Sequence, residues 1–291
     1  MITIGTHNGL HHPDDVIGCF LLKSLNPESQ IIRTRDKKLL SECDFLVDIG
    51  GAYNKSTGLF DHHQKDAPIR ENGIPYSASG LVWRDYGRDY IKYLYSDISV
   101  EGLEWIWKNM DEKFFLIGDM LDNHMMDNNP VDIFNMILSI SDSSMESFNY
   151  GMELSQLHIN FMIKKEKNIF DDNQIIQNCI KEAIQNKQNY VFLPKEMNTD
   201  CISNETNIYF AIFPYSDGTT KMIRCLGQDD DLLTPVFPFQ EKYRGLLSDK
   251  LVMITNNPNH LFVHHKGFCA GATTLEDAKQ MIEMTTIYSV K

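Results

Sequence analysis

The sequence predicts an α/β fold, in which a parallel-sheet N-terminal domain with a helical segment precedes a smaller α+β C-terminal domain. Three observations support this class. Strand-like and helix-like segments alternate over residues 2–63, helical periodicity dominates residues 77–188, and short β-like runs punctuated by Pro and Gly follow from residue 190. We therefore expect two domains, at residues 1–190 and 191–291.

Four short apolar segments near the N-terminus are the expected strands of the parallel sheet. They are residues 2–6, 30–34, 45–49 and 59–61. Between the first two, Asp14–Ser24 has helical spacing, with Val16, Ile17 and Phe20 on one side. Pro13 stands just before two carboxylates, which suits a helix N-terminus. The strand–helix–strand order favours parallel pairing.

The rest of the chain predicts helices first and then a second set of strands. Helices are expected over residues 106–120 and 144–187, strands over 208–213, 222–226 and 261–264, and a final helix over 274–284. The tryptophans lie at helical spacing, so we expect core positions rather than base-stacking platforms. They are Trp83, Trp105 and Trp107.

Composition limits the function classes. The 291 residues include 27 basic and 40 acidic side chains, giving a formal charge of −13. This charge excludes a broad basic face for duplex nucleic acid, although a few local cations could hold a strand end. Six scattered cysteines without a CxxC pair indicate reduced thiols. With no leader or membrane segment visible, we expect a cytoplasmic protein; a nuclear one is also compatible.

Histidines and aspartates gather at the ends of the predicted N-terminal strands. They are His7, His11, His12, His62 and His63 with Asp14, Asp15, Asp48 and Asp61. Carboxyl ends of parallel strands converge on one crevice, and imidazole with carboxylate suits Mn²⁺, Fe²⁺ or Zn²⁺. Taken singly, a His pair is most simply interpreted as two surface residues, and Asp14–Asp15 as favourable negative charge at a helix N-terminus. Together they favour a metal site, with His11 interpreted as a loop residue.

These motifs resemble the DHH phosphoesterase superfamily, and within it the branch named after the melanocyte proliferating gene protein. The resemblance covers nearly the whole chain. The matching blocks are residues 5–9 with 12–15, 47–51, 60–64, 79–82, 119–123, 243–246, 262–264, 267–268 and 271. The sequence departs from the branch at His124, where Gly usually follows Asn.

The resemblance implies a phosphoesterase with two divalent ions, usually Mn²⁺, with Mg²⁺, Zn²⁺ or Fe²⁺ as alternatives. The implied metal ligands are His7, His12, Asp14, Asp48, His62 and Asp122. Asp48 would bridge both ions, and Asp119 is the alternative to Asp122.

Asp61 and His63 are the implied catalytic residues. Asp61 suits the orientation of a neighbouring imidazole, and direct metal ligation is the alternative. His63 would face the scissile phosphate, either giving a proton to the leaving oxygen or only donating a hydrogen bond.

Candidate substrate-binding residues lie in the C-terminal domain. Arg224, His264 and Lys266 could hold further phosphates, or could be solvated surface residues. Gly267 and Gly271 could let backbone N–H groups approach a phosphate, or could be turn glycines.

The leading functional hypothesis is a two-metal phosphodiesterase, specifically a 3′–5′ exonuclease acting on single-stranded RNA or short oligonucleotides. One alternative is a small-molecule phosphohydrolase such as a pyrophosphatase. Another is a metal-binding regulatory protein without turnover.

Overall fold

The computed structural model describes residues 1–127, 132–203, 206–228 and 231–288. The chain forms two compact units, Met1–Phe170 and Asp171–Lys291. The division falls inside the long helix α7 (Met145–Gln185), whereas the sequence predicts a boundary after residue 190. Each unit combines a sheet with helices, so the predicted α/β class is confirmed.

A five-stranded sheet lies in the first unit, in the order β2-β1-β3-β5-β4. Its strands are β1 (Thr3–Thr6), β2 (Gln30–Arg33), β3 (Phe45–Val47), β4 (Tyr53–Asn54) and β5 (Leu59–Phe60). β1 pairs in parallel with β2 and β3, and β3 pairs in parallel with β5. Only β4, which the sequence did not predict, runs antiparallel to its neighbour.

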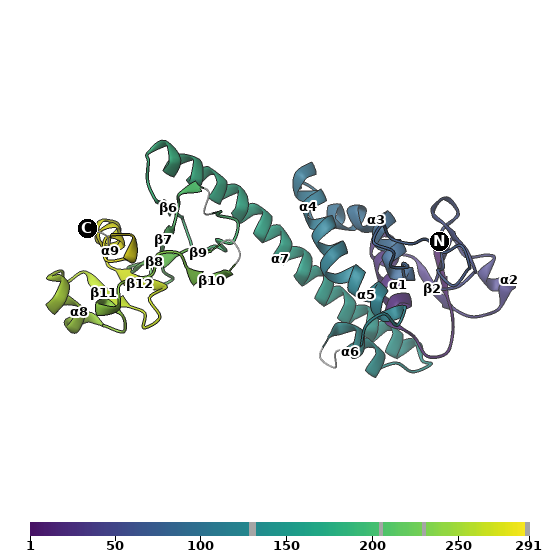
Figure 1. Cartoon of the computed structure of the whole chain (residues 1–291). Helices are drawn as coiled ribbons and strands as arrows, with labels where there is room; N and C mark the ends of the chain where they lie inside the picture. The colour runs from purple at the N-terminus through teal and green to yellow at the C-terminus, as the bar shows by residue number, and fades with distance from the viewer. Residues whose placement is uncertain (128–131, 204–205, 229–230, 289–291) are drawn as a thin grey trace. The chain divides into compact units, whose positions relative to one another are not determined.

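Helices of the first unit pack beside this sheet, with α3 in contact with α1, α4 and α5 (Figure 1). The helices are α1 (Pro13–Leu25), α2 (Lys37–Leu40), α3 (Ala78–Leu94), α4 (Val100–Met110), α5 (Leu116–Asp122), α6 (Ile133–Ser139) and α7, with a 3-10 turn at Lys55–Thr57. The helix predicted over 106–120 is instead α4, a π-helical turn (Asp111–Phe115) and α5. A π-turn adds a residue to the helical repeat, and here Phe114 and Phe115 are both buried.

The tryptophans belong to the core of the first unit, as predicted. Trp83 is fully buried, and its ring stacks on Phe115 with centroids 4.4 Å apart and an interplanar angle of 11°. Trp105 and Trp107 are partly buried against the same core. Apolar burial of this kind contributes about 25 cal/mol per Å² of surface removed from water.

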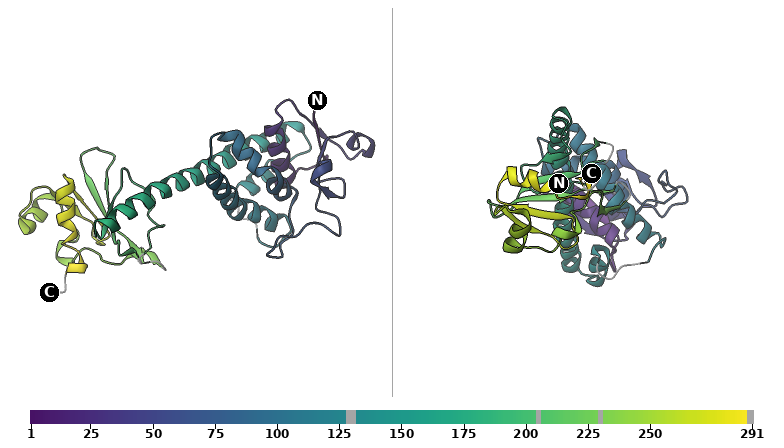
Figure 2. Two further views of the ribbon diagram at one scale, coloured as in Figure 1. Left: turned by 90° about the horizontal axis from the view of Figure 1, so that it is seen from above. Right: turned by 60° about the vertical axis from the view of Figure 1, so that its left-hand side comes forward.

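The second unit contains another five-stranded sheet, in the order β11-β12-β8-β7-β6. Its elements are β6 (Tyr190–Phe192), β7 (Phe210–Pro214), β8 (Lys221–Cys225), α8 (Ser248–Thr255), β11 (His260–Val263), β12 (Cys269–Ala272) and α9 (Leu275–Ile282), with the β9 (Gly227–Gln228)–β10 (Asp231–Pro235) ladder and 3-10 turns at Glu241–Tyr243 and Thr286–Tyr288. α9 packs across β8 and β12 (Figure 2). The predicted strands and final helix are present; β6, β9, β10, β12 and α8 are additional.

None of the helices within the described ranges combines the length and apolar character needed to cross a membrane. All six cysteines are unpaired, as the scattered spacing predicts.

Candidate metal centre

Strand ends and helix ends of the first unit carry the candidate ligands. His7 follows β1, Asp48 follows β3, and His62 follows β5. Asp14 lies in the first turn of α1, and Asp122 is the last residue of α5. Because the carboxyl ends of parallel strands meet at one edge of a sheet, residues more than a hundred positions apart meet in one place.

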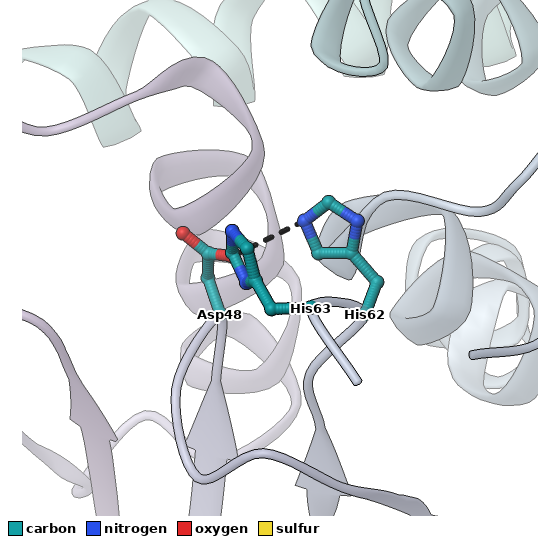
Figure 3. Close-up of side chains that lie close together, drawn as sticks. All are labelled: Asp48, His62 and His63. Atoms are coloured by element: carbon teal, nitrogen blue, oxygen red, sulfur yellow. Dashed lines mark ion pairs between the residues drawn. The ribbon is translucent and has the colours of Figure 1, made fainter. Parts of the chain in front are cut away.

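The carboxylate of Asp48 joins histidines that follow two different strands. Its Oδ2 lies 3.2 Å from His7 Nε2, and its Oδ1 lies 3.3 Å from His62 Nε2 and 3.4 Å from His63 Nδ1. Figure 3 shows the ring of His62 directed toward this carboxylate. Ligand atoms of Asp48, His62 and His63 all lie within 4.8 Å of one another.

A second group of ligand atoms lies beside the first. His12, Asp14 and Asp122 bring one ligand atom each within 4.8 Å of the others. His62 Nε2 is 3.3 Å from Asp122 Oδ2 and 3.7 Å from Asp14 Oδ2. His62 thus stands between the two groups, and the structure brings together all six residues of the predicted ligand set.

Asp15, which the sequence analysis groups with the metal-type residues but not with the implied ligands, also lies at this centre. It is fully buried; its Oδ1 accepts a hydrogen bond from the His12 backbone N–H at 2.9 Å, and its Oδ2 lies 3.4 Å from His7 Nε2. Asp15 therefore caps α1 and positions His7 at once. Its place directly after Asp14 was the available signal.

Buried oxygen atoms without partners show that the donor set fits a cation. Among the described residues, neither oxygen of Asp14 has a hydrogen-bond partner, and the same holds for Asp48 Oδ1 and Asp15 Oδ2. Asp14 is 3% exposed. Burying unpaired carboxylates costs several kcal/mol each, and imidazole plus carboxylate donors suit Mn²⁺, Fe²⁺ or Zn²⁺. A divalent ion would supply the missing positive charge.

The carboxylates of the centre differ in pKa. For Asp48, burial acts to raise the pKa, but the close imidazoles of His62 and His7 outweigh it and lower the pKa to about 2. For Asp14, burial and the charges of Asp48 and Asp122 raise the pKa well above its usual range. Burial raises the pKa of Asp15 to about 7. Crowded like charges shift pKa values in this way when no cation is present.

The pKa values of two histidines of the centre, His7 and His62, are raised. The hydrogen bond to Asp48 raises the pKa of His7, against an opposing effect of burial. For His62, burial lowers the pKa, but Asp48 and the charge of Asp122 outweigh it and raise the pKa. Without a metal ion, protons on these rings supply positive charge beside the carboxylates, and metal binding displaces them.

Asp61 contacts His63 rather than His62. Its Oδ1 lies 2.8 Å from His63 Nδ1, and its Oδ2 accepts a hydrogen bond from the Gly51 backbone N–H at 2.6 Å. Both oxygens are therefore in use, which favours an orienting role over direct ligation. The side chain of His63 is 65% exposed, so its Nε2 faces outward.

Asp119 lies outside the ligand cluster and forms a separate buried network. Its Oδ2 accepts from Arg70 Nε at 2.6 Å, while its Oδ1 accepts from Ser77 N at 2.9 Å and Ser77 Oγ at 2.7 Å. Arg70 also makes a bidentate pair with Asp111, at 2.6 and 3.0 Å. The geometry favours Asp122 over Asp119 as the ligand from this segment. Nothing in the sequence indicated Arg70.

Backbone conformation aims the central carboxylate. Asp48 has a φ of 57°, in the left-handed region that costs a residue with a Cβ roughly 1 kcal/mol or more. A hydrogen bond from Asp48 N to Phe60 O, at 3.0 Å, holds this turn against β5. Asp tolerates the left-handed region better than most residues, so one residue type supplies both the turn and the ligand.

The candidate substrate cations occupy the second unit. Arg224 on β8 pairs with Glu196 at 2.5 Å, and its Nη1 donates to Met197 O at 3.4 Å. His264 follows β11; its Nδ1 accepts a hydrogen bond from Lys266 N at 3.2 Å, and its ring lies 4.3 Å from that of Phe268. Lys266 is exposed.

The two predicted phosphate-loop glycines have distinct surroundings. Gly267 lies in the turn between β11 and β12 with a φ of 73°, and a Cβ there would come within 2.6 Å of Arg244 Nε. Gly271 lies inside β12, where a Cβ would come within 2.5 Å of the Phe262 ring. α9 begins later, at Leu275. Turn geometry and close packing account for these glycines locally.

Comparisons with known proteins agree with the geometry. A family model described as "Uncharacterised protein family (UPF0160)", MYG1_exonuc, matches residues 3–286. A fission yeast (Schizosaccharomyces pombe) protein named "MYG1 protein C694.04c" is 25% identical over 97% of this chain and 96% of its own length. "MYG1 exonuclease" from Mus musculus is 26% identical, covering 97% of this chain and 84% of that protein, and the Homo sapiens protein of the same name is also 26% identical, covering 97% and 85%.

One solved structure, described as "pGpG-specific phosphodiesterase - PggH from Vibrio cholrae", aligns over 97% of both chains. Its TM-score of 0.31 and identity of 16% are too low to support an argument.

The prediction of a hydrolytic enzyme is confirmed at the level of the family, because curated relatives carry the name exonuclease. The match extends over nearly the whole chain. The chain belongs to the MYG1_exonuc family.

Proposed function

We propose that the protein is a metal-dependent phosphodiesterase, and specifically a 3′–5′ exonuclease acting on single-stranded RNA or short oligonucleotides. The observation that carries this proposal is the pair of adjacent ligand groups, linked by His62 and holding buried carboxylate oxygens without hydrogen-bond partners. The names of the curated relatives support nuclease activity.

The residues would hold two divalent ions, with Mn²⁺ the first choice. His7, His12, Asp14, Asp48, His62 and Asp122 would hold the two ions, with Asp48, whose carboxylate offers two oxygens, shared by both. When bound, such ions lower the pKa of water to supply a nucleophile near neutral pH, and they neutralise charge on phosphoryl oxygens.

His63 is proposed to act on the leaving group. Its Nδ1 is held by Asp61 Oδ1 at 2.8 Å, which fixes the ring plane and leaves Nε2 as the outward atom. From there Nε2 can donate a proton or a hydrogen bond to the leaving oxygen. Asp61 is then a positioning residue, anchored in turn by the Gly51 N–H.

We propose that residues of the second unit bind further phosphates of the substrate. Arg224, His264 and Lys266 would supply cationic and hydrogen-bonding side chains. Gly267 and Gly271 would let backbone N–H groups approach a phosphate beside them. An acidic chain that binds its substrate through metal ions and a few local cations agrees with the net charge of −13.

The test is release of mononucleotides from single-stranded RNA labelled at its 3′ end, with Mn²⁺ in the buffer. Wild type should release the labelled nucleotide, and Asp48→Asn should not. Asn also tolerates the left-handed backbone, so this variant removes charge without adding strain. Asp66→Asn is the matched control, because Asp66 is exposed and follows His63 by three residues.

Three outcomes would contradict the proposal. Equal release by wild type and Asp48→Asn would remove the centre from catalysis. Faster phosphate release from pyrophosphate than nucleotide release from RNA would indicate the small-molecule phosphohydrolase. Bound metal by elemental analysis without hydrolysis of any phosphoester would indicate the regulatory alternative.

A further inference from the structure

A cavity of about 260 Å³ adjoins the candidate metal centre in the first unit. His12, Asp14 and Asp122 form one wall of it. This volume is close to the lower end of small-molecule sites, about 300 Å³, and suits one nucleobase rather than a stacked pair. A group bound in this cavity could belong to the same molecule as a phosphate held at the metal centre.

The other walls of the cavity are mostly apolar. Leu121 and Leu138 contribute aliphatic surface, and Phe134 contributes a ring. Among the described lining residues there is no Lys or Arg. A second phosphate would therefore meet carboxylates without a cation, whereas an uncharged ring would meet surfaces that favour it.

The aromatic wall is rigid. The ring of Phe134 stacks on Phe114, with centroids 5.0 Å apart and an interplanar angle of 26°. The absence of a side chain at Gly118 permits its approach, because a Cβ there would come within 2.9 Å of the Phe134 ring. Phe134 is 7% exposed. An aromatic side chain can provide a stacking surface for a base.

The mouth of the cavity carries a histidine in an unfavourable backbone conformation. His124 follows α5 with a φ of 54°, and its exposed side chain contributes to the lining. The left-handed backbone here ends α5, with Met125 N donating to Met120 O at 2.8 Å. The imidazole adds a second aromatic and hydrogen-bonding group to the lining.

We propose that this cavity is a subsite for the unpaired nucleobase of the terminal nucleotide, with Phe134 and Leu138 as its walls and His124 at its mouth. The proposal rests on the proposed function, since the phosphate of that nucleotide is the one held by the metal centre. It adds that the enzyme recognises a base in addition to a phosphate.

The test measures binding of two phosphates that differ only by the base. The full chain, loaded with Mn²⁺, is titrated calorimetrically with AMP and with ribose 5-phosphate. AMP should bind at least about tenfold more tightly, since stacking of one base on an aromatic side chain is typically of this size or larger. Equal affinity, or undetectable binding of AMP, would overturn the proposal.

Two variants connect the discrimination to the cavity. Leu138→Trp should fill it and bring the AMP preference close to one, whereas Met136→Trp should retain the preference. Met136 is 45% exposed on the same helix, comparable with 41% for Leu138, and it does not line the cavity. A preference unchanged by Leu138→Trp would refute the assignment.

His124→Gly is a third variant, chosen because Gly adopts the left-handed backbone readily and the fold is not at risk. It should weaken AMP binding without lowering the melting temperature. Unchanged AMP binding would remove His124 from the subsite. Preference for AMP over ribose 5-phosphate without RNA hydrolysis would support the base subsite and refute the exonuclease. RNA hydrolysis without this preference would support the exonuclease and refute the base subsite.

Discussion

Removing the carboxylate of Asp119 should destabilise the first unit strongly. Asp119→Ala leaves Arg70 Nε and Ser77 N unpaired in a buried place, while Ser77 Oγ keeps its contact with Ser79 Oγ at 3.1 Å. Arg70 keeps its bidentate pair with Asp111, so its charge is not wholly uncompensated. Breaking one partner from a buried pair costs about 3–5 kcal/mol. For a unit of this size, that loss corresponds to a fall in melting temperature of roughly 6–20 °C.

Tryptophan fluorescence during urea unfolding is the appropriate assay. All three tryptophans, Trp83, Trp105 and Trp107, lie in the first unit. Their emission therefore reports the free energy of unfolding of that unit without a contribution from the second. Glu112→Ala is the control, because Glu112 is exposed in the same π-helical turn as Asp111, and its loss should change stability by less than about 0.5 kcal/mol.

The isosteric variant separates structure from ligation. Asp119→Asn can still accept a hydrogen bond from Ser77, but its amide group would face Arg70. We therefore expect a loss of stability that is smaller than that of Asp119→Ala. Its Mn²⁺ affinity should stay measurable, because Asp122 is the proposed ligand on α5. A stability loss below about 1 kcal/mol in Asp119→Ala, or abolished metal binding with wild-type stability in Asp119→Asn, would refute this reasoning.

Three further expectations concern the centre and its scaffold. His63→Gln should lower kcat by about 10²–10⁴-fold while Mn²⁺ affinity, measured by calorimetry, stays near that of wild type; a parallel loss of metal would make His63 a ligand. Mn²⁺ should bind more tightly as pH rises, because contact with Asp48 raises the pKa of His7, burial raises that of Asp14, and both must lose protons to bind metal. Calorimetry at pH 6 and pH 8 in two buffers should detect proton release, and an identical Kd at both values would contradict it. Gly58→Ala should cost about 2 kcal/mol or more in urea unfolding, because φ is 72° and a Cβ would come within 2.2 Å of Asp44 O; wild-type stability would show that the turn before β5 relaxes easily.

Much of the first unit was predictable because its evidence is local in the sequence. The strands around Ile4, Val47 and Phe60 are apolar runs that end at polar residues, and parallel pairing brings those ends together. The gathering of His7, Asp48 and His62 follows from that rule alone.

Other features depend on packing between distant segments and left no sequence signal. Arg70 meets Asp119 across 49 positions, because the segment before α3 lies against α5. The π-turn before α5 changes the helical phase without a proline or glycine to mark it. β12 was missed because its four residues, Cys269–Ala272, are small and lack the β-branched side chains typical of a strand.

The buried, unpartnered oxygens of Asp14 also affect the lifetime of the protein. Folding confines this carboxylate beside Asp48 and Asp122, so the metal-free chain retains a repulsion that the unfolded chain relieves. An ion that binds only the folded form stabilises it by about 4 kcal/mol at a thousand times its Kd. Under the proposed function, scarcity of the ion would therefore increase the fraction of unfolded chains open to proteolysis. Metal supply would regulate how much enzyme persists as well as how fast it works.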